Sequence, residues 1–587
     1  MLTELTADRV VKKAEIISRL NDPDELFERR SFSGGEYFVI KPEYDRLNDL
    51  GIIAAAMSNN AARNISAEMP LMKSPFGKFA GRGDYFSEYA CSLLGREPGE
   101  CWGLISAPLG NSANIAAYVK KVLLPLTGEE NMSEESIALH RKRLAEEREK
   151  FLAQHLTVTE MAREISEARS PESCPAFAAL FSEDTDRYIA AQSADPYMTD
   201  EYDEAREELF FRACMLMKEL VLGSRSLLTD LRIFGEMRLG TKPCDPAVMT
   251  GVFPALFLLT PLFSATLASF HTMMRGIHGS GGFGTLVVDE AGQSLPQFAV
   301  GAMYRARRAF IVGDPKQLPP VVTEDIHMIS ELIRQAMCAE GRDIPGVYSS
   351  KDISVQSLAD SVNPYGRYIQ GQWVGCPLSL HHRCADPMFT VSNRYSYGGT
   401  MIMMTGGVPS GSRFILPGSC WINISDESVN NITRNSQYMP EHGRAVLRLI
   451  MEAFRKVSAG TVPDLFVISP FVTVVEGIKG YLEGFNWFRQ DNVKRWAQGE
   501  HIGTVHTFQG KEAAEVIFAV GCNLFTAASV TGSVSRNLVN VAVTRAKYRL
   551  YVVGNGDACA ESAPLTELRE VLKDSEYRDL VFEATED

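Results

Sequence analysis

The sequence contains no CxxC pair and no local cluster of cysteine and histidine, although it has eleven cysteines. This excludes the usual ligand spacings of zinc and iron–sulfur modules and favours reduced thiols in a cytoplasmic protein. No apolar run reaches bilayer-spanning length. The nearest, LFLLTPLFSATLASF, is too short and contains Pro, Thr and Ser. The charged N-terminus is unlike a signal peptide, so no membrane partner is predicted.

The chain also lacks a net excess of basic residues. The chain has 59 Lys and Arg against 73 Asp and Glu, a formal net charge of −14. This balance argues against a surface that attracts polyanions everywhere, but it leaves room for a local basic groove. With 587 residues, of which 45% are hydrophobic, the chain is long enough for several globular domains with large cores.

The most informative stretch is 285–320, which reads TLVVDEAGQSLPQ and then AFIVGDPKQLPP. The apolar runs 286–288 and 310–312 predict buried strands of a parallel sheet. Asp289 and Glu290 end the first run, and Asp314 and Gln317 follow the second, where parallel sheets bind ligands. An aspartate there suits Mg²⁺, and a neighbouring glutamate suits activating a water for attack on a γ-phosphate. The alternative is an ordinary doubly wound sheet with acidic loop residues.

DEAGQ and GDPKQLPP together resemble motifs II and III of superfamily 1 helicases, in the Upf-like, DNA2/NAM7-type branch. The resemblance implies an α/β fold of two RecA-like domains, each a parallel sheet flanked by helices, with ATP and Mg²⁺ between them. It also implies that Asp289 holds the metal and that Gly313, Asp314 and Gln317 join it in binding ATP. Asp289, Glu290 and Gln317 would then be catalytic.

Two upstream segments predict contacts with a phosphate backbone. Ser58, Asn59 and Asn64 lie at a strand-to-helix junction, which presents backbone N–H groups and small polar side chains to a phosphate. Ser58 could equally be an ordinary helix N-cap. Thr266 and Ser269 follow another apolar run, where hydroxyls can donate to phosphate oxygens. These segments resemble motifs Ia and Ic, which implies a single-stranded DNA or RNA partner.

GTVHTFQGKEAAEVIFAV, in the second half of the chain, resembles motif V. The resemblance implies that Thr504 and His506 contact nucleic acid and that Gly510 and Glu512 lie near the nucleotide. Glu512 is predicted to begin a helix.

Two arginines are predicted to face the transferring phosphate. Arg383, in LSLHHR, lies where the family places an arginine opposite the γ-phosphate, whereas the two preceding histidines are more consistent with ordinary packing. Arg545, in NLVNVAVTRAK, resembles the arginine finger of motif VI. An isolated TRAK would instead indicate a basic surface patch.

One family motif is missing, because no GxxxxGK[ST] phosphate loop occurs in the sequence. APLGNSANIAAY has Ala113 and Asn114 where the lysine and hydroxyl belong, and it predicts a strand, a glycine turn and a helix. The chain is therefore either a fragment or a P-loop-less relative. Two functions stay open: an ATP-dependent helicase or translocase, 5′-to-3′ by family analogy, and a catalytically impaired nucleic-acid-binding or scaffold protein.

The predicted domains are a first RecA-like domain (1–125 and 245–330), a helical insert (126–244), a linker (331–364), a second RecA-like domain (365–575) and an acidic tail (576–587). The insert is predicted to be an antiparallel helical hairpin or a stalk, because its two long runs are helical and charged. It is either a solvated helix pair or a surface for a protein partner. Residues 1–30 are predicted to be helical.

Overall fold

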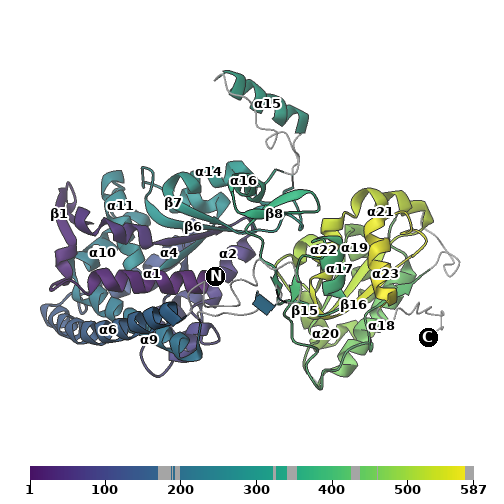
Figure 1. Cartoon of the computed structure of the whole chain (residues 1–587), viewed down its shortest axis with the longest axis horizontal. Helices are drawn as coiled ribbons and strands as arrows, with labels where there is room; N and C mark the ends of the chain where they lie inside the picture. Colours follow the sequence, from purple (N-terminus) through teal and green to yellow (C-terminus); the bar gives the residue numbers. More distant parts are fainter. Residues whose placement is uncertain are drawn as a thin grey trace. The chain divides into compact units, whose positions relative to one another are not determined.

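The chain forms two compact units, which Figure 1 shows with their helices and strands labelled. The first comprises Met1–Asp314 and Pro320–Leu358, and the second Pro315–Pro319 and Ala359–Asp587. The computed structural model describes residues 1–168, 187, 190–191, 198–321, 326–339, 353–424, 436–458 and 460–574. Within these ranges no helix has both the length and the apolar character to cross a membrane.

The first unit is built on a five-stranded parallel sheet with the order β4-β5-β3-β6-β7. Its central strand β3 (Ile52–Ala56) is buried along its whole length between β5 (Leu262–Thr266) and β6 (Phe283–Asp289). A strand covered on both faces needs continuous apolar residues, and the sequence IIAAA supplies them. The two edges are β4 (Ser106–Pro108) and β7 (Ala306–Ile311).

Helices cover this sheet and enclose a single large apolar core. Helix α2 (Asn59–Glu68) contacts β3, β4 and β5, and α14 (Pro296–Arg305) contacts β6 and β7. The other elements are α1 (Leu2–Ile17), the antiparallel pair β1 (Phe27–Phe32) and β2 (Gly35–Ile40), α3 (Ser87–Leu94), α4 (Ser112–Tyr118), α5 (Leu124–Leu126), α10 (Arg225–Leu239), α11 (Pro246–Val252), α12 (Leu256–Leu259), α13 (Phe270–Met273), α15 (Ile326–Ala339) and α16 (Val355–Val362).

The expectation that run 310–312 is a buried strand is wrong in one respect. β7 is parallel to β6, as predicted, but it is the last strand of the sheet and most of its residues are exposed. Phe310 is 42% exposed. An apolar run gives no information about whether a neighbour covers it, so composition could not separate an edge strand from a central one.

The two long helices of the predicted insert lie antiparallel, as predicted. α6 (Glu134–Ala168) packs against α9 (Asp200–Gly223), and Figure 1 shows both running beside α1. The direction follows from two contacts: His140 Nδ1 lies 2.6 Å from Glu219 Oε2, and Gln154 Nε2 donates to the Ala205 carbonyl at 3.0 Å. α6 buries one residue in every seven, at 137, 144, 151 and 158, so only a narrow stripe of this charged helix faces the core.

The second unit is built on another five-stranded parallel sheet, with the order β12-β16-β15-β13-β14. The strands are β12 (Cys420–Asn423), β13 (Leu465–Ser469), β14 (Ile502–Thr504), β15 (Ala513–Gly521) and β16 (Ala546–Gly554). Successive residues of β15 face opposite cores: Val516 and Phe518 lie in one cluster, and Ile517 and Ala519 in the other. Both faces of the sheet are therefore buried.

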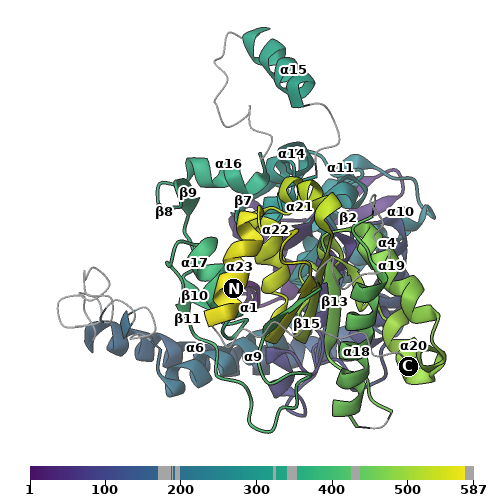
Figure 2. The same cartoon turned by 90° about the vertical axis from the view of Figure 1, so that its right-hand side faces the viewer.

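Figure 2 shows the helices that cover these two faces. On one side lie α18 (Pro440–Lys456) and α19 (Val472–Glu483), and on the other α17 (Met388–Tyr395), α22 (Arg536–Val543) and α23 (Ala563–Asp574). The remaining elements are the antiparallel pair β8 (Gly366–Ile369) and β9 (Gln372–Gly375), the short parallel pair β10 (Leu380–His381) and β11 (Ile402–Met403), α20 (Asp491–Gln498) and α21 (Ala527–Ser533). Two parallel sheets flanked by helices confirm the predicted fold class.

Two local predictions are wrong. Glu512 does not begin a helix: it directly precedes β15, because the mostly apolar run that follows it pairs with β13 and β16. The first helix ends at Ile17, and residues 27–32 and 35–40 form a hairpin instead of continuing it. The predicted acidic tail 576–587 and residues 340–352 of the predicted linker 331–364 lie outside the described residues.

Candidate functional site

The strand register of the first unit gathers the predicted residues at one sheet edge. Ala56, the last residue of β3, is paired with both Thr266 of β5 and Asp289 of β6. The carboxyl ends of three adjacent parallel strands therefore meet at one level, where ligands bind in such sheets. Ser58 and Glu290 follow immediately in the chain.

Asp289 and Glu290 form the acidic part of this edge. Asp289 Oδ1 accepts a hydrogen bond of 3.0 Å from the Glu290 N–H. Burial raises the pKa of Asp289, partly offset by that hydrogen bond. Glu290 has φ 54°, in the left-handed region that costs a non-glycine residue about 1 kcal/mol. Its Oε2 accepts a hydrogen bond of 2.8 Å from Gln293 Nε2, which fixes the carboxylate.

The loop after β6 packs tightly against the loop after β7. The Ala291 N–H donates to the Val312 carbonyl at 2.9 Å. A Cβ on Gly313 would lie 2.7 Å from the backbone nitrogen of Gly292, so only glycine fits there. A Cβ on Gly292 would lie 3.0 Å from the Asp314 carbonyl. The DEAGQ and GDP segments therefore pack together and form one surface.

The residues predicted to contact nucleic acid in this unit are engaged locally. Ser58 is the N-cap of α2, its Oγ accepting from the Ala61 N–H at 3.1 Å. Thr266 Oγ1 accepts from the Ser269 N–H at 3.2 Å and lies 2.8 Å from Ser269 Oγ. Asn59 and Asn64 are exposed on α2. Capping does not prevent a hydroxyl from also contacting a phosphate, so these roles stay predictions.

In the second unit, Arg383 and Glu512 lie together. Arg383 Nε is 3.4 Å from Glu512 Oε2, and Lys547 Nζ is 2.6 Å from Glu512 Oε1. The hydrogen bond from Lys547 to Glu512 raises the pKa of that lysine. Two cations thus share one half-exposed carboxylate, which leaves positive charge at the surface for an anion.

Arg545 is placed differently from the expectation for an arginine finger. It is 1% exposed, and its guanidinium donates to the carbonyl oxygens of Val541 at 3.0 Å and Lys511 at 2.9 Å. It therefore ties the end of α22 to the loop before β15 inside the second unit. Its contact with a phosphate stays a prediction, and it would require these hydrogen bonds to rearrange.

Gln317 lies in the segment of motif III that packs with the second unit. Asn537 Nδ2 donates to the Gln317 carbonyl at 2.6 Å, and Asn540 Nδ2 donates to the Lys316 carbonyl at 2.9 Å. Both asparagines lie on α22. The first unit thus holds Asp289, Glu290, Gly313 and Asp314, whereas the second holds Gln317 and both arginines.

The motif V residues surround the start of β15. Thr504 ends β14 and its Oγ1 lies 3.2 Å from Thr507 Oγ1, and His506 is exposed in the following turn. Gly510 has φ 78°, which favours glycine at this bend. The bend brings Glu512 beside Arg383 and Lys547.

Sequence reasoning assigned no role to three residues of this site. Lys547 follows the predicted arginine finger by two positions, and Asn537 and Asn540 hold the motif III backbone. The lysine of TRAK was visible in the sequence, but its pairing with Glu512 depends on the adjacent strands β15 and β16. Nothing in the sequence indicated which carbonyls the asparagines would contact.

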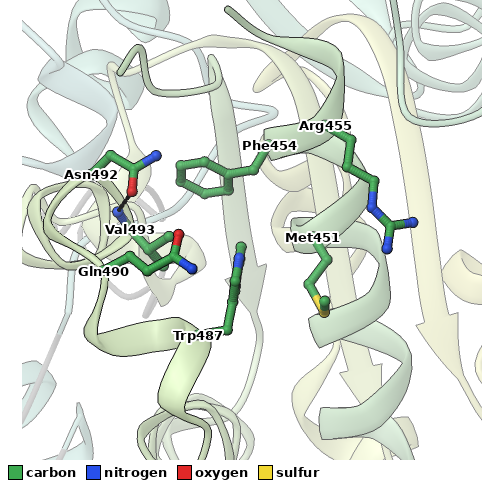
Figure 3. A pocket seen from close by; sticks show the side chains of 7 residues that line it. All are labelled: Met451, Phe454, Arg455, Trp487, Gln490, Asn492 and Val493. Carbon is green, nitrogen blue, oxygen red and sulfur yellow. Dashed lines mark hydrogen bonds between the residues drawn. The ribbon is translucent and has the colours of Figure 1, made fainter. Parts of the chain in front are cut away.

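A separate small pocket of about 180 Å³ lies on the second unit, shown in Figure 3. Met451 and Phe454 of α18 face Trp487 and Val493 across it. None of the predicted site residues lines this pocket, so it carries no part of the argument on function.

Comparison with known proteins agrees with the class of molecule that these units define, a nucleotide-binding protein with parallel α/β domains. Residues 260–325 and 370–557 each match a family model described as an AAA domain. The DNA replication ATP-dependent helicase/nuclease DNA2 of Gallus gallus is 22% identical over 302 residues, which cover 49% of this chain and 24% of that protein. The chain thus spans about a quarter of the length of this curated relative.

Among solved structures, Arterivirus nonstructural protein 10 (helicase) is similar at 12% identity, over 52% of this chain and 45% of that chain, with a TM-score of 0.25. A structure titled XPD helicase matches at 10% identity, over 60% of this chain and 78% of that chain, with a TM-score of 0.24. Scores this low do not bear on the assignment. The AAA domain models and the DNA2 relative support a likeness to the superfamily 1 DNA2/NAM7-like helicase family.

Proposed function

We propose that this chain is an ATP-dependent helicase or translocase that acts on single-stranded nucleic acid, with 5′-to-3′ travel and a cytoplasmic location as finer parts of the proposal. The observation that carries it is the convergence of Asp289, Glu290 and the Gly313–Asp314 loop at the carboxyl edge of the first sheet. This arrangement places an acidic pair and a tight glycine loop where parallel sheets bind phosphates. The likeness to this helicase family supports the same reaction.

The Asp289 carboxylate fits a divalent cation. It is largely buried, and in the described part of the chain no lysine or arginine pairs with it, so a bound cation would offset the cost of burying its charge. Mg²⁺ bound there supplies charge that screens the phosphates of ATP. Glu290, fixed by Gln293, would accept a proton from the attacking water.

The second unit would contribute positive charge to the phosphates. Arg383 and Lys547 share Glu512, and their side chains are each more than a third exposed, at 40% and 35%. A phosphate anion can therefore reach both side chains from solvent and compete with Glu512 for them. Thr504 and His506, together with Ser58, Asn59, Asn64, Thr266 and Ser269 of the first unit, would contact the nucleic-acid backbone.

The direct test is phosphate release from ATP with and without an unlabelled oligonucleotide, on the purified 587-residue chain. Glu290→Gln should lower stimulated turnover by about a hundredfold or more, because general-base catalysis contributes about that much. Glu88→Gln removes an exposed carboxylate on α3 and is the matched control. Equal turnover in wild type and Glu290→Gln would end the proposal for this site.

A catalytically impaired nucleic-acid-binding or scaffold protein is the second candidate. The absence of a GxxxxGK[ST] motif from these residues and the buried hydrogen bonds of Arg545 favour it. Under this candidate the chain binds single strands but releases no phosphate, in wild type and Glu290→Gln alike. If the chain does hydrolyse ATP, unwinding of partially duplex substrates with a 5′ or a 3′ single-stranded tail gives its direction of travel.

A further inference from the structure

A groove of about 530 Å³ lies in the first unit between α13 with its following loop and α14. Its floor includes the buried side chains of Leu267, Phe270, Met274 and Ile277. The volume is in the range of small-ligand sites and is large enough for one nucleotide. None of the predicted site residues lines it, but Leu267 and Ala268 do, and they lie between Thr266 and Ser269 in the chain.

The charged side chains that line this groove are all basic. They are Arg275 and Arg305, with His271 and His278 beside them, and no Asp or Glu lines the groove. Neither 267–288 nor 291–313 contains a single acidic residue, although the chain as a whole has a net charge of −14. The groove is therefore a local positive region on an acidic protein, which favours an anionic ligand.

Neither of these two arginines forms an ion pair with a carboxylate of the described residues. Arg275 is exposed, and in the described ranges no carboxylate pairs with it. Arg305 donates one hydrogen bond, to the Gly301 carbonyl at 3.1 Å, and its buried Nε has no acceptor among the described residues. Arg238 lies close by: burial lowers its pKa to about 10, and the charge of Arg275 contributes to this shift. Phosphate oxygens in the groove would accept hydrogen bonds from Arg275 and from Arg305 Nε.

The groove also offers an aromatic surface. Phe298, on α14, lines it and is 44% exposed. An exposed aromatic ring beside unpaired arginines is the combination that binds a single-stranded base and its phosphate, through stacking and charge. An acidic peptide would use the charge but would gain little from the ring. Nucleic acid is therefore the favoured occupant.

We propose that this groove binds a nucleotide of the single strand, with phosphate at Arg275 and Arg305 and a base against Phe298. The inference rests on the proposed function, because it extends the strand beyond the predicted contacts at Thr266 and Ser269. It assigns the strand a path along the α13–α14 surface, with residues that the helicase motifs do not include.

The test is fluorescence anisotropy of a fluorescein-labelled oligo(dT) of about 20 nucleotides with the whole chain, at several salt concentrations. Arg275→Ala should weaken binding about fivefold or more and reduce the slope of log affinity against log salt by about 0.7, the value for one lost phosphate contact. Phe298→Ala should weaken binding about fivefold and leave that slope unchanged. Arg19→Ala removes an exposed charge elsewhere in the first unit and is the matched control.

The outcomes separate the groove from the general function. If wild type binds oligo(dT) and both groove variants match Arg19→Ala, the groove assignment is overturned while the proposed function stands. If wild type shows no binding, both are overturned. If labelled polyglutamate binds wild type and loses this binding in Arg275→Ala, while oligonucleotide binding is the same in both, the groove takes acidic polypeptide and the proposal is wrong. Circular dichroism of each variant confirms that folding is retained.

Discussion

Lys13 is a lysine buried inside the first unit, away from the usual place of lysine at the surface. Its ammonium group is 1% exposed inside the first unit and donates to the Phe257 carbonyl at 2.5 Å. Burial, with a further contribution from the charge of Arg9, lowers its pKa from 10.5 to about 7. In the unfolded chain the pKa returns to its ordinary value, so the folded state binds fewer protons at mildly alkaline pH.

The free energy of unfolding should therefore rise with pH between about 7 and about 10, because the unfolded chain holds the extra proton there. Lys13→Met should raise the free energy of unfolding at pH 7 by about 2 kcal/mol and flatten this pH dependence, since it removes a buried charge while keeping the packing. Urea denaturation followed by circular dichroism measures both effects.

Lys12→Met is the matched control, because Lys12 is the adjacent lysine and its side chain is 47% exposed beside Asp8. It should change the free energy of unfolding by less than about 0.5 kcal/mol. A Lys13→Met variant with the same pH dependence as wild type would contradict the assigned burial.

Residue types in a motif could be read from the sequence, but their surroundings could not. DEAGQ correctly indicated an acidic pair at the end of a buried strand, and the strand register confirms that placement. TRAK indicated a cation at 545, yet whether the guanidinium faces solvent or carbonyl oxygens depends on where the loop before β15 lies. That loop is brought there by strand pairing, which is a long-range property.

At the scale of elements, the α6–α9 hairpin shows how little apolar surface is needed to position a charged helix. Phe151 is fully buried against the core of the first unit, whereas the next residue, Leu152, is 47% exposed. Neighbouring residues on a helix point about 100° apart, so one lies in the narrow buried stripe and the other outside it. The stripe supplies the buried apolar contacts of α6, and polar contacts such as Arg141 with Asp22 and Asp24 add to them.

Phe151→Ala should therefore lower the free energy of unfolding of the first unit by about 3 kcal/mol, because it removes buried area and leaves a cavity. Leu152→Ala, one position along the same helix, should cost less than about 0.5 kcal/mol. Thermal and urea unfolding of the two variants measures the difference. Equal losses would mean that α6 is rotated from the observed position.

Edge strand β7 shows that a sequence pattern can predict a strand but not its position in the sheet. Its apolar residues resemble those of β6, but β6 has neighbours on both sides and β7 has one. Edge and central strands differ in what lies beside them, which local composition does not encode. The β-hairpin at 27–40 was not predicted, because the helical pattern that precedes it was extended too far along the chain.

At the scale of the whole molecule, the described side chains form separate cores. One apolar cluster belongs to the first unit, and the two clusters on either face of the second sheet belong to the second unit. Units with independent cores commonly unfold in separate steps.

Differential scanning calorimetry of the intact chain should therefore show two transitions. Phe151→Ala should lower the temperature of one of them and leave the other within about 1 °C, because the cavity lies in one core only. A single transition, with equal calorimetric and van't Hoff enthalpies, would show that the cores unfold together.

The sequence by itself determined the α/β class, the acidic pair at 289 and 290, the helical character of the insert and the resemblance to superfamily 1 helicases, because each is encoded in local residue order. Only the tertiary structure decided which strand is an edge, that Arg545 is buried, that Lys547 joins Arg383 on Glu512, and that a basic groove lies beside α14. These features depend on which distant segments pack together. Burial and pairing are set by those neighbours and not by the residues alone.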